Sequence, residues 1–379
     1  MKVLFFLPGV TPWWFDEIIA PMLRALLAGP QRVEAHVVTA KLWRNTGITP
    51  ENYLGVADLP GVQWHIVDAA DPAAFRFAAA KVEGLRELAA GIDPDLVLAR
   101  SPDLALAELF PGTVRWLMEA AAPPFATDVH WIVLDEQPFH HGFLPAGVDA
   151  FADDCAARLA PPADAARARL AGDHRAALGL PADRPVLAVP LHYEHPENLV
   201  LVHAAHRDGT GLLAALLDTL DPAILLAVSD HPLNRLHVDR APLDVLAARH
   251  PDRIALFTGA GQTDRLAACA DAMTSDLSKT WTLGAFLGTP LLNLGRPMAD
   301  WLGALPGLTA LPARFSRDSL PAADPVAARR WFGWHIGGRL VDPARLDVPQ
   351  LLRRVAGQPD AADAAQACRL VLDRQEIPA

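Results

Sequence analysis

The chain has 379 residues, of which 51% are hydrophobic and 20% are charged, and its formal net charge at pH 7 is −11. One hydrophobic core does not usually serve a chain of this length, so we expect two domains. The negative charge argues against a nucleic acid polymer as the main partner, because such binding depends on clustered Lys and Arg.

Cysteine content and hydropathy limit the other classes of protein. Cys155, Cys269 and Cys368 are widely spaced and form no Cys-x-x-Cys motif. They predict neither a disulfide framework nor a structural zinc site, and they fit a reducing cytoplasm. The apolar run at the N-terminus stops at Pro8, too early for a signal peptide. No stretch approaches the roughly 20 apolar residues that cross a bilayer, so any membrane association is expected to be peripheral.

Strand-like and helix-like segments alternate in the first half of the chain. Strands are expected at residues 3–7, 33–39, 62–67, 96–99 and 130–134. Helices are expected at 12–28, 72–90 and 104–121. Such alternation predicts a parallel sheet covered by helices.

A second alternation follows a turn-rich segment. Its strands are expected at 186–190, 224–228, 254–258, 272–274 and 291–294, and its helices at 212–220, 243–250, 263–270 and 279–287. The sequence therefore predicts an α/β protein with two Rossmann-like domains that face each other across a cleft. The expected divisions are a first domain at 1–165, a linker at 166–183, a second domain at 184–325, and a helical segment at 326–379 that packs back towards the first domain.

A Ser-Asp-His-Pro stretch follows the apolar run 224–228 and contains Ser229, His231 and Pro232. The run suits a strand that is buried on both faces of a parallel sheet. His231 would then lie at the carboxyl edge of the sheet, where ligands bind in open α/β folds. The alternative is a loop histidine after a strand that Pro232 terminates.

Ser278 and Thr280 stand between a short strand and a helical pattern. Hydroxyls and backbone N–H groups at the amino end of a helix form a phosphate cradle, and an ordinary helix cap is the alternative. Adjacent strand ends would bring His231 and Ser278 to one edge, where the phosphate or ribose of a nucleotide would touch both.

Three further loops lie at expected strand ends. Gly9 and Thr11 follow the first strand, and the glycine would let a substrate approach the backbone. The loop lacks the G-x-G-x-x-G spacing of a dinucleotide site. Gly261 lies in a similar loop after 254–258, and Arg100 leaves the strand at 96–99, where it would meet a negatively charged group.

Four titratable residues follow the strand at 130–134: Asp135, Glu136, His140 and His141. A carboxylate or imidazole at a strand end that faces the cleft would serve as a general base, and a solvated turn is the alternative. Adjacent histidines on a strand point to opposite sides, which argues against a metal at this pair. A second histidine-rich region, 192–206, lacks the cysteines or compact hairpin of a zinc module, so no metal site is expected.

Together these features resemble the GT-B fold of glycosyltransferases and, more narrowly, the capsular polysaccharide biosynthesis family that includes Kdo transferases. The resemblance lies in FHHGFLPAGVD at 139–149, in SDHP at 229–232, and in SKTWT at 278–282 with its closing LGTP. Two positions depart from the family pattern. His140 and His141 stand where the family has an acidic residue, and Trp281 stands where glycine is usual.

The resemblance implies metal-independent transfer of a sugar from a nucleotide-sugar donor, CMP-Kdo-like or other, to a hydroxyl of a glycan, glycolipid or protein. No cofactor is implied beyond the nucleotide sugar. The second domain would hold the donor through Ser229, His231, Pro232, Gly261, Ser278 and Thr280. The first domain would hold the acceptor through Gly9, Thr11 and Arg100, with the base among Asp135, Glu136, His140 and His141.

Two other functions fit the same sequence. One is a nucleotide-sugar epimerase of the same fold, which would act on the donor alone. The other is a catalytically degenerate subunit that binds a nucleotide or glycan for a partner.

Overall fold

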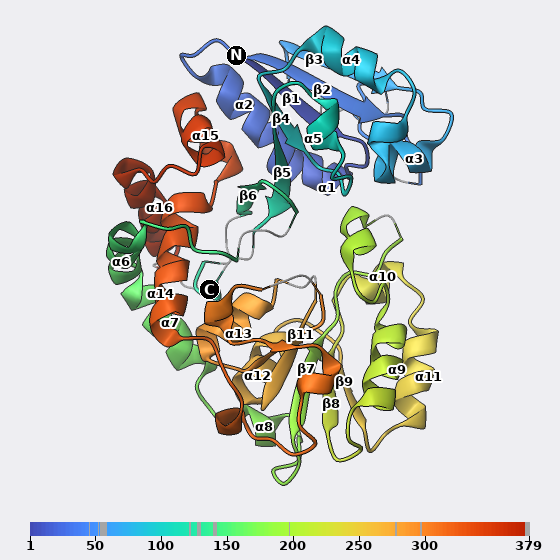
Figure 1. Ribbon diagram of the computed structural model, residues 1–379, viewed down its shortest axis with the longest axis vertical. Helices are drawn as coiled ribbons and strands as arrows, with labels where there is room; N and C mark the ends of the chain where they lie inside the picture. The colour runs from blue at the N-terminus through green and yellow to red at the C-terminus, as the bar shows by residue number, and fades with distance from the viewer. Residues whose placement is uncertain are drawn as a thin grey trace. The chain divides into compact units, whose positions relative to one another are not determined.

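The computed structural model describes residues 1–44, 46–51, 53, 59–120, 123–126, 130–138, 142–196, 198–276, 279–295 and 298–375 (Figure 1). Contacts divide the chain into two compact units. The first unit contains Met1–Ala120, Asp128–His141 and His335–Ala367, and the second contains Ala121–Thr127, Gly142–Trp334 and Cys368–Ala379. No helix in the described ranges is both long and apolar enough to span a membrane.

The described residues of the first unit form one sheet in the order β3-β2-β1-β4-β5-β6. Its strands are β1 (Lys2–Leu7), β2 (Glu34–Ala40), β3 (Val62–Val67), β4 (Leu96–Ala99), β5 (Thr113–Glu119) and β6 (Ile132–Asp135). Strands β1 to β5 are parallel, whereas β6 runs antiparallel to β5. This is the doubly wound order, in which the direction of winding switches between β1 and β4.

The helical elements of the first unit come from both ends of the chain. They are α1 (Pro12–Trp14), η1 (Phe15–Ile19), α2 (Ala20–Ala28), α3 (Pro72–Phe77), η3 (Ala79–Lys81), α4 (Leu85–Ile92), α5 (Leu106–Leu109), η8 (His335–Arg339), η9 (Pro343–Arg345), α15 (Val348–Val355) and the first part of α16 (Ala361–Gln375). The predicted helix at 12–28 forms as α1, η1 and α2, and Thr11 caps it. Ile132 and Val341 exchange backbone hydrogen bonds, which attaches the C-terminal return to strand β6.

The predicted helix at 104–121 is wrong. Only α5 is helical there, and the rest is strand β5. Pro111-Gly112 ends the helix, and TVRWLME then supplies β-branched and aromatic residues that favour a strand. A Cβ atom on Gly112 would lie 2.1 Å from the Pro94 carbonyl oxygen, so the close approach of these backbones requires glycine.

The second unit repeats the same architecture with a fully parallel sheet. Its described strands, in the order β12-β11-β10-β7-β8-β9, are β7 (Val186–Pro190), β8 (Leu225–Ser229), β9 (Ile254–Phe257), β10 (Ala272–Ser275), β11 (Leu291–Asn293) and β12 (Leu305–Pro306). The switch point lies between β7 and β10. Five of these strands match the predicted ones closely, and the two sheets confirm the predicted α/β class with Rossmann-like order.

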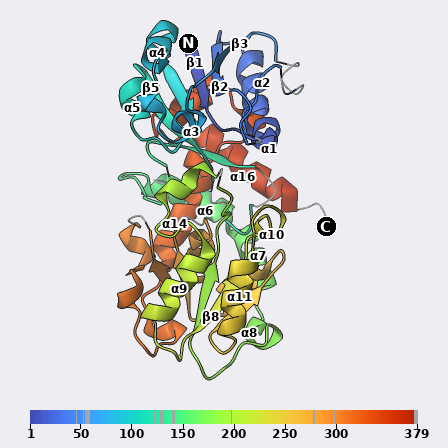
Figure 2. The ribbon, with the colours of Figure 1, turned by 90° about the vertical axis from the view of Figure 1, so that its right-hand side faces the viewer.

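Helices of the second unit flank its sheet. They are α6 (Asp149–Arg158), α7 (Ala160–Leu170), α8 (His174–Ala177), η4 (Leu199–His203), α9 (Gly209–Thr219), α10 (Asn234–His237), α11 (Ala241–Arg249), α12 (Gln262–Cys269), α13 (Trp281–Leu287), η5 (Asp300–Leu302), η6 (Leu308–Ala310), η7 (Arg317–Ser319) and α14 (Pro325–Trp334). Figure 2 shows α9 and α11 side by side, which agrees with the contacts between these two helices.

The division of the chain differs from the expected boundaries at 165 and 326. Helix α6 belongs to the second unit because it packs along α14. Arg330 on α14 bonds Asp153 at 2.8 Å and Asp149 at 3.1 Å, and both carboxylates lie on α6. The chain then enters the first unit at His335, within the segment that was expected to be wholly a helical return.

Candidate nucleotide site

The carboxyl edge of the second sheet gathers polar residues around its switch point. His192, Tyr193 and Glu194 follow β7, Asp230 and His231 follow β8, and Asp276 follows β10. Because the strands are parallel, these residues leave the sheet at the same edge. Ligands bind at this position in open α/β sheets.

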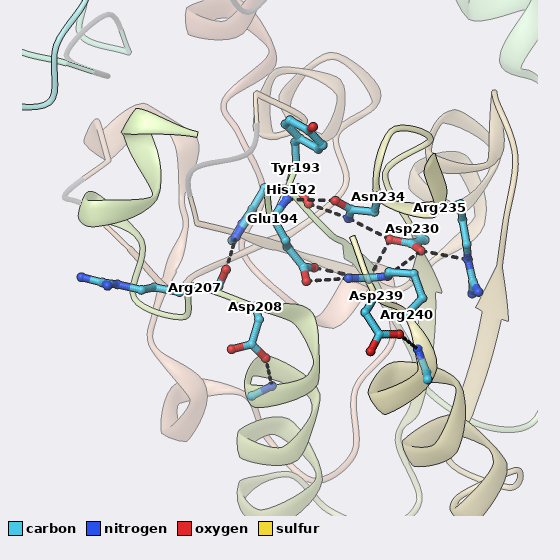
Figure 3. A network of polar contacts seen from close by, with 12 residues as sticks. His192, Tyr193, Glu194, Arg207, Asp208, Asp230, Asn234, Arg235, Asp239 and Arg240 are labelled. Atoms are coloured by element: carbon cyan, nitrogen blue, oxygen red, sulfur yellow. Dashed lines mark hydrogen bonds and ion pairs between the residues drawn. The ribbon is translucent and has the colours of Figure 1, made fainter. Parts of the chain in front are cut away.

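A buried ion network supports this edge (Figure 3). Arg240 donates to Glu194 Oε2 at 2.6 Å and to Asp230 Oδ1 at 2.8 Å. The side chains of these three residues are only 1–5% exposed. Arg235, which is 33% exposed, adds a second cation 3.2 Å from Asp230 Oδ2 and also pairs with Asp244 at 2.7 Å. Buried charges are tolerated when they are paired in this way.

Asn234 joins the two loops that carry the site. Its Oδ1 accepts from the Glu194 backbone N–H at 2.9 Å, and its Nδ2 donates to the His192 carbonyl and to Asp230 Oδ1, each at 2.9 Å. The side chain is fully buried. Asn234 therefore links the loop after β7 to the loop after β8.

Four rings come together from the loop after β7, the loop after β8 and helix α10. The Tyr193 ring lies 5.6 Å from His231, 5.7 Å from His195 with the planes nearly parallel, and 6.4 Å from His237. We call these four residues the ring cluster. Nδ1 of His231 accepts from the Leu233 backbone N–H at 3.3 Å, so the neutral imidazole carries its proton on Nε2. The cluster offers stacking faces and N–H donors, which suit a base, a ribose or a phosphate.

Asp276 brings a carboxylate to the same edge. Its oxygens accept from the Ala205 backbone N–H at 3.2 and 3.4 Å, and its side chain lies against Gly295. Burial raises the pKa of this carboxyl, while the Ala205 hydrogen bond and the charges of His192 and His206 partly offset that rise. A raised pKa is a property of general acids and bases.

The other residues predicted to bind the donor lie at several different positions in the second unit. Ser229 is buried, and its hydroxyl accepts from the Thr263 hydroxyl at 3.0 Å, which links β8 to α12. Pro232 is exposed beside His231, and Gly261 is the N-cap residue before α12, with a φ of 76°. Thr280 precedes α13, a helix of seven residues. Ser278 lies outside the described residues, so its predicted meeting with His231 stays a prediction.

The predicted acceptor residues gather at the switch point of the first sheet. Gly9 and Thr11 follow β1, and Arg100 follows the neighbouring strand β4. The Thr11 hydroxyl accepts from the Trp14 backbone N–H at 3.4 Å, and the Arg100 guanidinium lies 4.1 Å above the Trp14 ring. Three residues chosen separately from the sequence therefore share one edge.

Asp135 and Glu136 do not lie at a carboxyl edge, contrary to the prediction. Strand β6 runs antiparallel, so it carries both residues towards the opposite edge of the sheet. Asp135 is fully buried and bonds Arg339 at 2.6 Å, an arrangement that fixes the C-terminal return. Glu136 is 72% exposed and lies 3.5 Å from Arg115. The other two base candidates, His140 and His141, lie outside the described residues.

Asn234, Arg240 and Asp276 were not selected from the sequence. Asp276 could have been found, because it directly follows a strand of the same sheet as His231. Arg240 carries no such signal, since it lies 46 residues from Glu194 and follows no strand. Among the described residues, no group of three His, Cys, Asp or Glu side chains is arranged to hold a metal.

Several solved structures are similar to the chain at low sequence identity. No family model matches it, and no curated protein matches it. Among solved structures, it is similar to the beta Kdo 2,7 transferase of Thermosulfurimonas dismutans KpsC, at 11% identity and a TM-score of 0.48, covering 89% of this chain and 99% of that one.

Two further structures are similar at comparable identity. The beta Kdo 2,4 transferase of the same KpsC is 12% identical, covers 98% of each chain and has a TM-score of 0.43. The UDP-GlcNAc 2-epimerase of Methanocaldococcus jannaschii, solved with UDP-GlcNAc and UDP, is 13% identical and covers 87% of this chain and 98% of that one, with a TM-score of 0.33. At these identities no residue role passes to the chain, so its roles must come from geometry.

Proposed function

We propose that the chain is a glycosyltransferase that binds a nucleotide sugar at the carboxyl edge of its second sheet and transfers the sugar to a hydroxyl acceptor held by the first unit. The supporting observation is the ring cluster on its buried network. Five side chains, those of Glu194, Asp230, Asn234, Arg235 and Arg240, link the loops that carry Tyr193 and His231 at a switch point, at the cost of burying three charges. Such a cost is typical of a functional site.

In this proposal His231 binds the donor phosphate. Its Nε2–H donates to a phosphate oxygen, and this hydrogen bond strengthens as the nucleotide leaves and negative charge develops. The Tyr193 ring stacks on the base or ribose. In this proposal His231, and not a metal ion, stabilises the charge on the donor phosphate. Activity should therefore persist in the presence of a chelator.

The test is a thermal-shift screen with CMP, UDP, GDP and dTDP and their sugars. One nucleotide is expected to stabilise the protein, and His231→Ala should weaken that binding by about 10- to 100-fold, the value of one hydrogen bond to a charged group. The matched control is His250→Ala, because His250 is exposed and precedes β9 at the opposite edge. Equal binding by both variants would contradict the proposal.

Epimerisation of the donor is the second candidate function. The observation that favours it is Asp276, a carboxyl with a raised pKa in the same unit as the ring cluster. An epimerase needs acid and base groups that act on the bound sugar itself. Incubation of the sugar nucleotide without an acceptor separates the two functions, since only an epimerase changes the sugar under those conditions.

A further inference from the structure

Arg100 occupies an unusual position in the first unit. Its backbone N–H donates to the Phe6 carbonyl at 2.9 Å, which fixes it beside β1 at the switch point of the sheet. Its guanidinium lies 4.1 Å above the ring of Trp14, a residue that is itself only 7% exposed. Stacking on a buried indole orients the planar guanidinium and reduces the entropy it would lose on binding a ligand.

The guanidinium lacks the partners that Arg76 and Arg240 have. Within the described residues it makes no hydrogen bond and no ion pair. By contrast, Arg76 donates to the Thr46 side chain and to backbone carbonyls, and Arg240 bonds two carboxylates. Burial lowers the pKa of Arg100 to about 10, and the nearby charge of Glu119 only partly offsets this. Arg100 is therefore charged at neutral pH and short of hydrogen-bond acceptors.

Arg100 is only partly buried, and a guanidinium without protein acceptors can bind a ligand that supplies them. Its fork of N–H groups matches the paired oxygens of a carboxylate or phosphate. We propose that Arg100, oriented by Trp14, is an oxyanion subsite that binds a carboxylate or phosphate group of the acceptor. The identification of this ligand as the acceptor rests on the proposed function, whereas the binding of an oxyanion by Arg100 does not.

The loop and the helix that follow β1 suit a sugar that carries such a group. Gly9 follows the neighbouring strand at the same edge. Trp13, next to Trp14 in the chain, leaves 46% of its surface exposed, and its ring meets His130 edge-on at 5.2 Å. An exposed indole offers an apolar surface to the face of a sugar ring. An acidic sugar or a sugar phosphate therefore fits better than a neutral sugar.

The experiment measures binding by calorimetry at low salt, with no donor present. Methyl β-glucuronide is compared with methyl β-glucoside, which differs by the carboxylate, and glucose 6-phosphate is compared with glucose. We expect the wild type to prefer one or both acidic ligands by at least about tenfold. A preference within the first pair identifies a carboxylate ligand, and a preference within the second identifies a phosphate ligand.

Variants test whether Arg100 causes the preference for acidic ligands. Arg100→Gln should abolish it, and Arg100→Lys should retain part of it, because an ammonium keeps the charge but loses the fork. Arg86→Gln, a change of an exposed arginine on α4, is the matched control and should leave it intact. Circular dichroism checks that each variant is folded. Equal binding of acidic and neutral ligands, or a preference that survives Arg100→Gln, would overturn the subsite.

Nucleotide thermal shifts on the same variants separate the two proposals. Wild-type nucleotide shifts in Arg100→Gln, together with lost anion binding, support the subsite. If the wild type binds anions through Arg100 but no nucleotide, the proposed function fails while the subsite stands. Loss of nucleotide binding in folded Arg100→Gln would contradict the assignment of Arg100 to the acceptor.

Discussion

Arg240 and Glu194 form a buried ion pair with an Nη1 to Oε2 distance of 2.6 Å, although the two residues come from different loops of the second unit. Neither side chain is more than 5% exposed. Removing both charges from water costs free energy. A second carboxylate, Asp230, offsets part of this cost because it bonds the same guanidinium. The pair therefore fixes the loop after β7 against the loop after β8.

Replacing Glu194 with Gln should destabilise the second unit by about 3–5 kcal/mol, because the variant leaves part of a buried guanidinium uncompensated. It should also weaken nucleotide binding, since Tyr193 lies on the loosened loop. Urea unfolding measures the first effect. The control is Asp164→Asn, which removes an ion pair whose carboxylate is 74% exposed and should change stability by less than about 1 kcal/mol. Similar losses in both variants would contradict the structural role of the network.

Tyr193 is expected to act through its ring rather than its hydroxyl. Burial raises the pKa of this phenol, so it stays protonated and neutral at physiological pH. Tyr193→Ala should weaken nucleotide binding by about tenfold, because base stacking and the support of His231 are lost together. Tyr193→Phe is the matched control and should bind nearly as the wild type does. Titration calorimetry measures both, and a large loss in Tyr193→Phe would assign the role to the hydroxyl instead.

The fold was largely predictable because buried parallel strands appear in the sequence as continuous apolar runs. Runs such as 186–190 give both the position and the length of a strand. Strand β5 was missed because TVRWLME places apolar residues at spacings that also fit a helix, and the tertiary approach of Gly112 to Pro94 decided the outcome. That approach joins segments that the local pattern cannot relate.

The site was predictable only where it follows from strand ends. That rule placed His231 and Arg100 at the carboxyl edges of their sheets, where the structure has them, whereas Arg240 and Asn234 lie in or next to helical segments beyond the loops. Asp135 was misinterpreted because the sequence does not reveal that β6 reverses direction, and this reversal changes the edge to which its last residue points. Strand direction depends on the connection, and the helix expected at 104–121, which would have made β6 parallel, is largely strand β5.

Asp135 is expected to stabilise the fold rather than to take part in catalysis. Asp135→Asn should cost about 3–5 kcal/mol in unfolding free energy, because Arg339 would lose a fully buried carboxylate. Glu136→Gln, its exposed neighbour, should change stability by no more than about 0.5 kcal/mol. Urea unfolding gives both values. A folded Asp135→Asn protein with wild-type stability and no transfer activity would restore Asp135 as a candidate base.

Gly333 sets the distance between α14 and α6. A Cβ atom there would lie 2.1 Å from the Ala152 carbonyl oxygen and 2.7 Å from the Ala156 nitrogen, both backbone atoms of α6. Gly333→Ala should therefore destabilise the second unit by at least about 2 kcal/mol, since the helices must separate. Gly91→Ala is the matched control: Gly91 lies in α4 with no atom within 4 Å of its added Cβ, and should gain up to about 1 kcal/mol. Thermal unfolding measures the stability of both variants. Equal changes in stability would show that α6 can move away from α14 without cost.

The raised pKa of Asp276 predicts a specific dependence of stability on pH. Because burial raises the pKa in the folded protein above its ordinary value of 3.8, the folded state binds this proton more tightly than the unfolded state. The resulting stability is fully present below pH 3.8 and is lost as pH rises through the raised pKa.

Asp276→Asn removes this titration and keeps an oxygen that can accept from Ala205. The unfolding free energy of the wild type, minus that of the variant, should therefore fall as the pH rises above 3.8 and through the raised pKa, as urea unfolding at several pH values would measure. Asp318→Asn, a change of an exposed carboxyl in the same unit, should show a much smaller trend. Parallel curves for the wild type and Asp276→Asn would mean that the carboxyl titrates normally, and would remove the observation that favours acid–base chemistry on the donor.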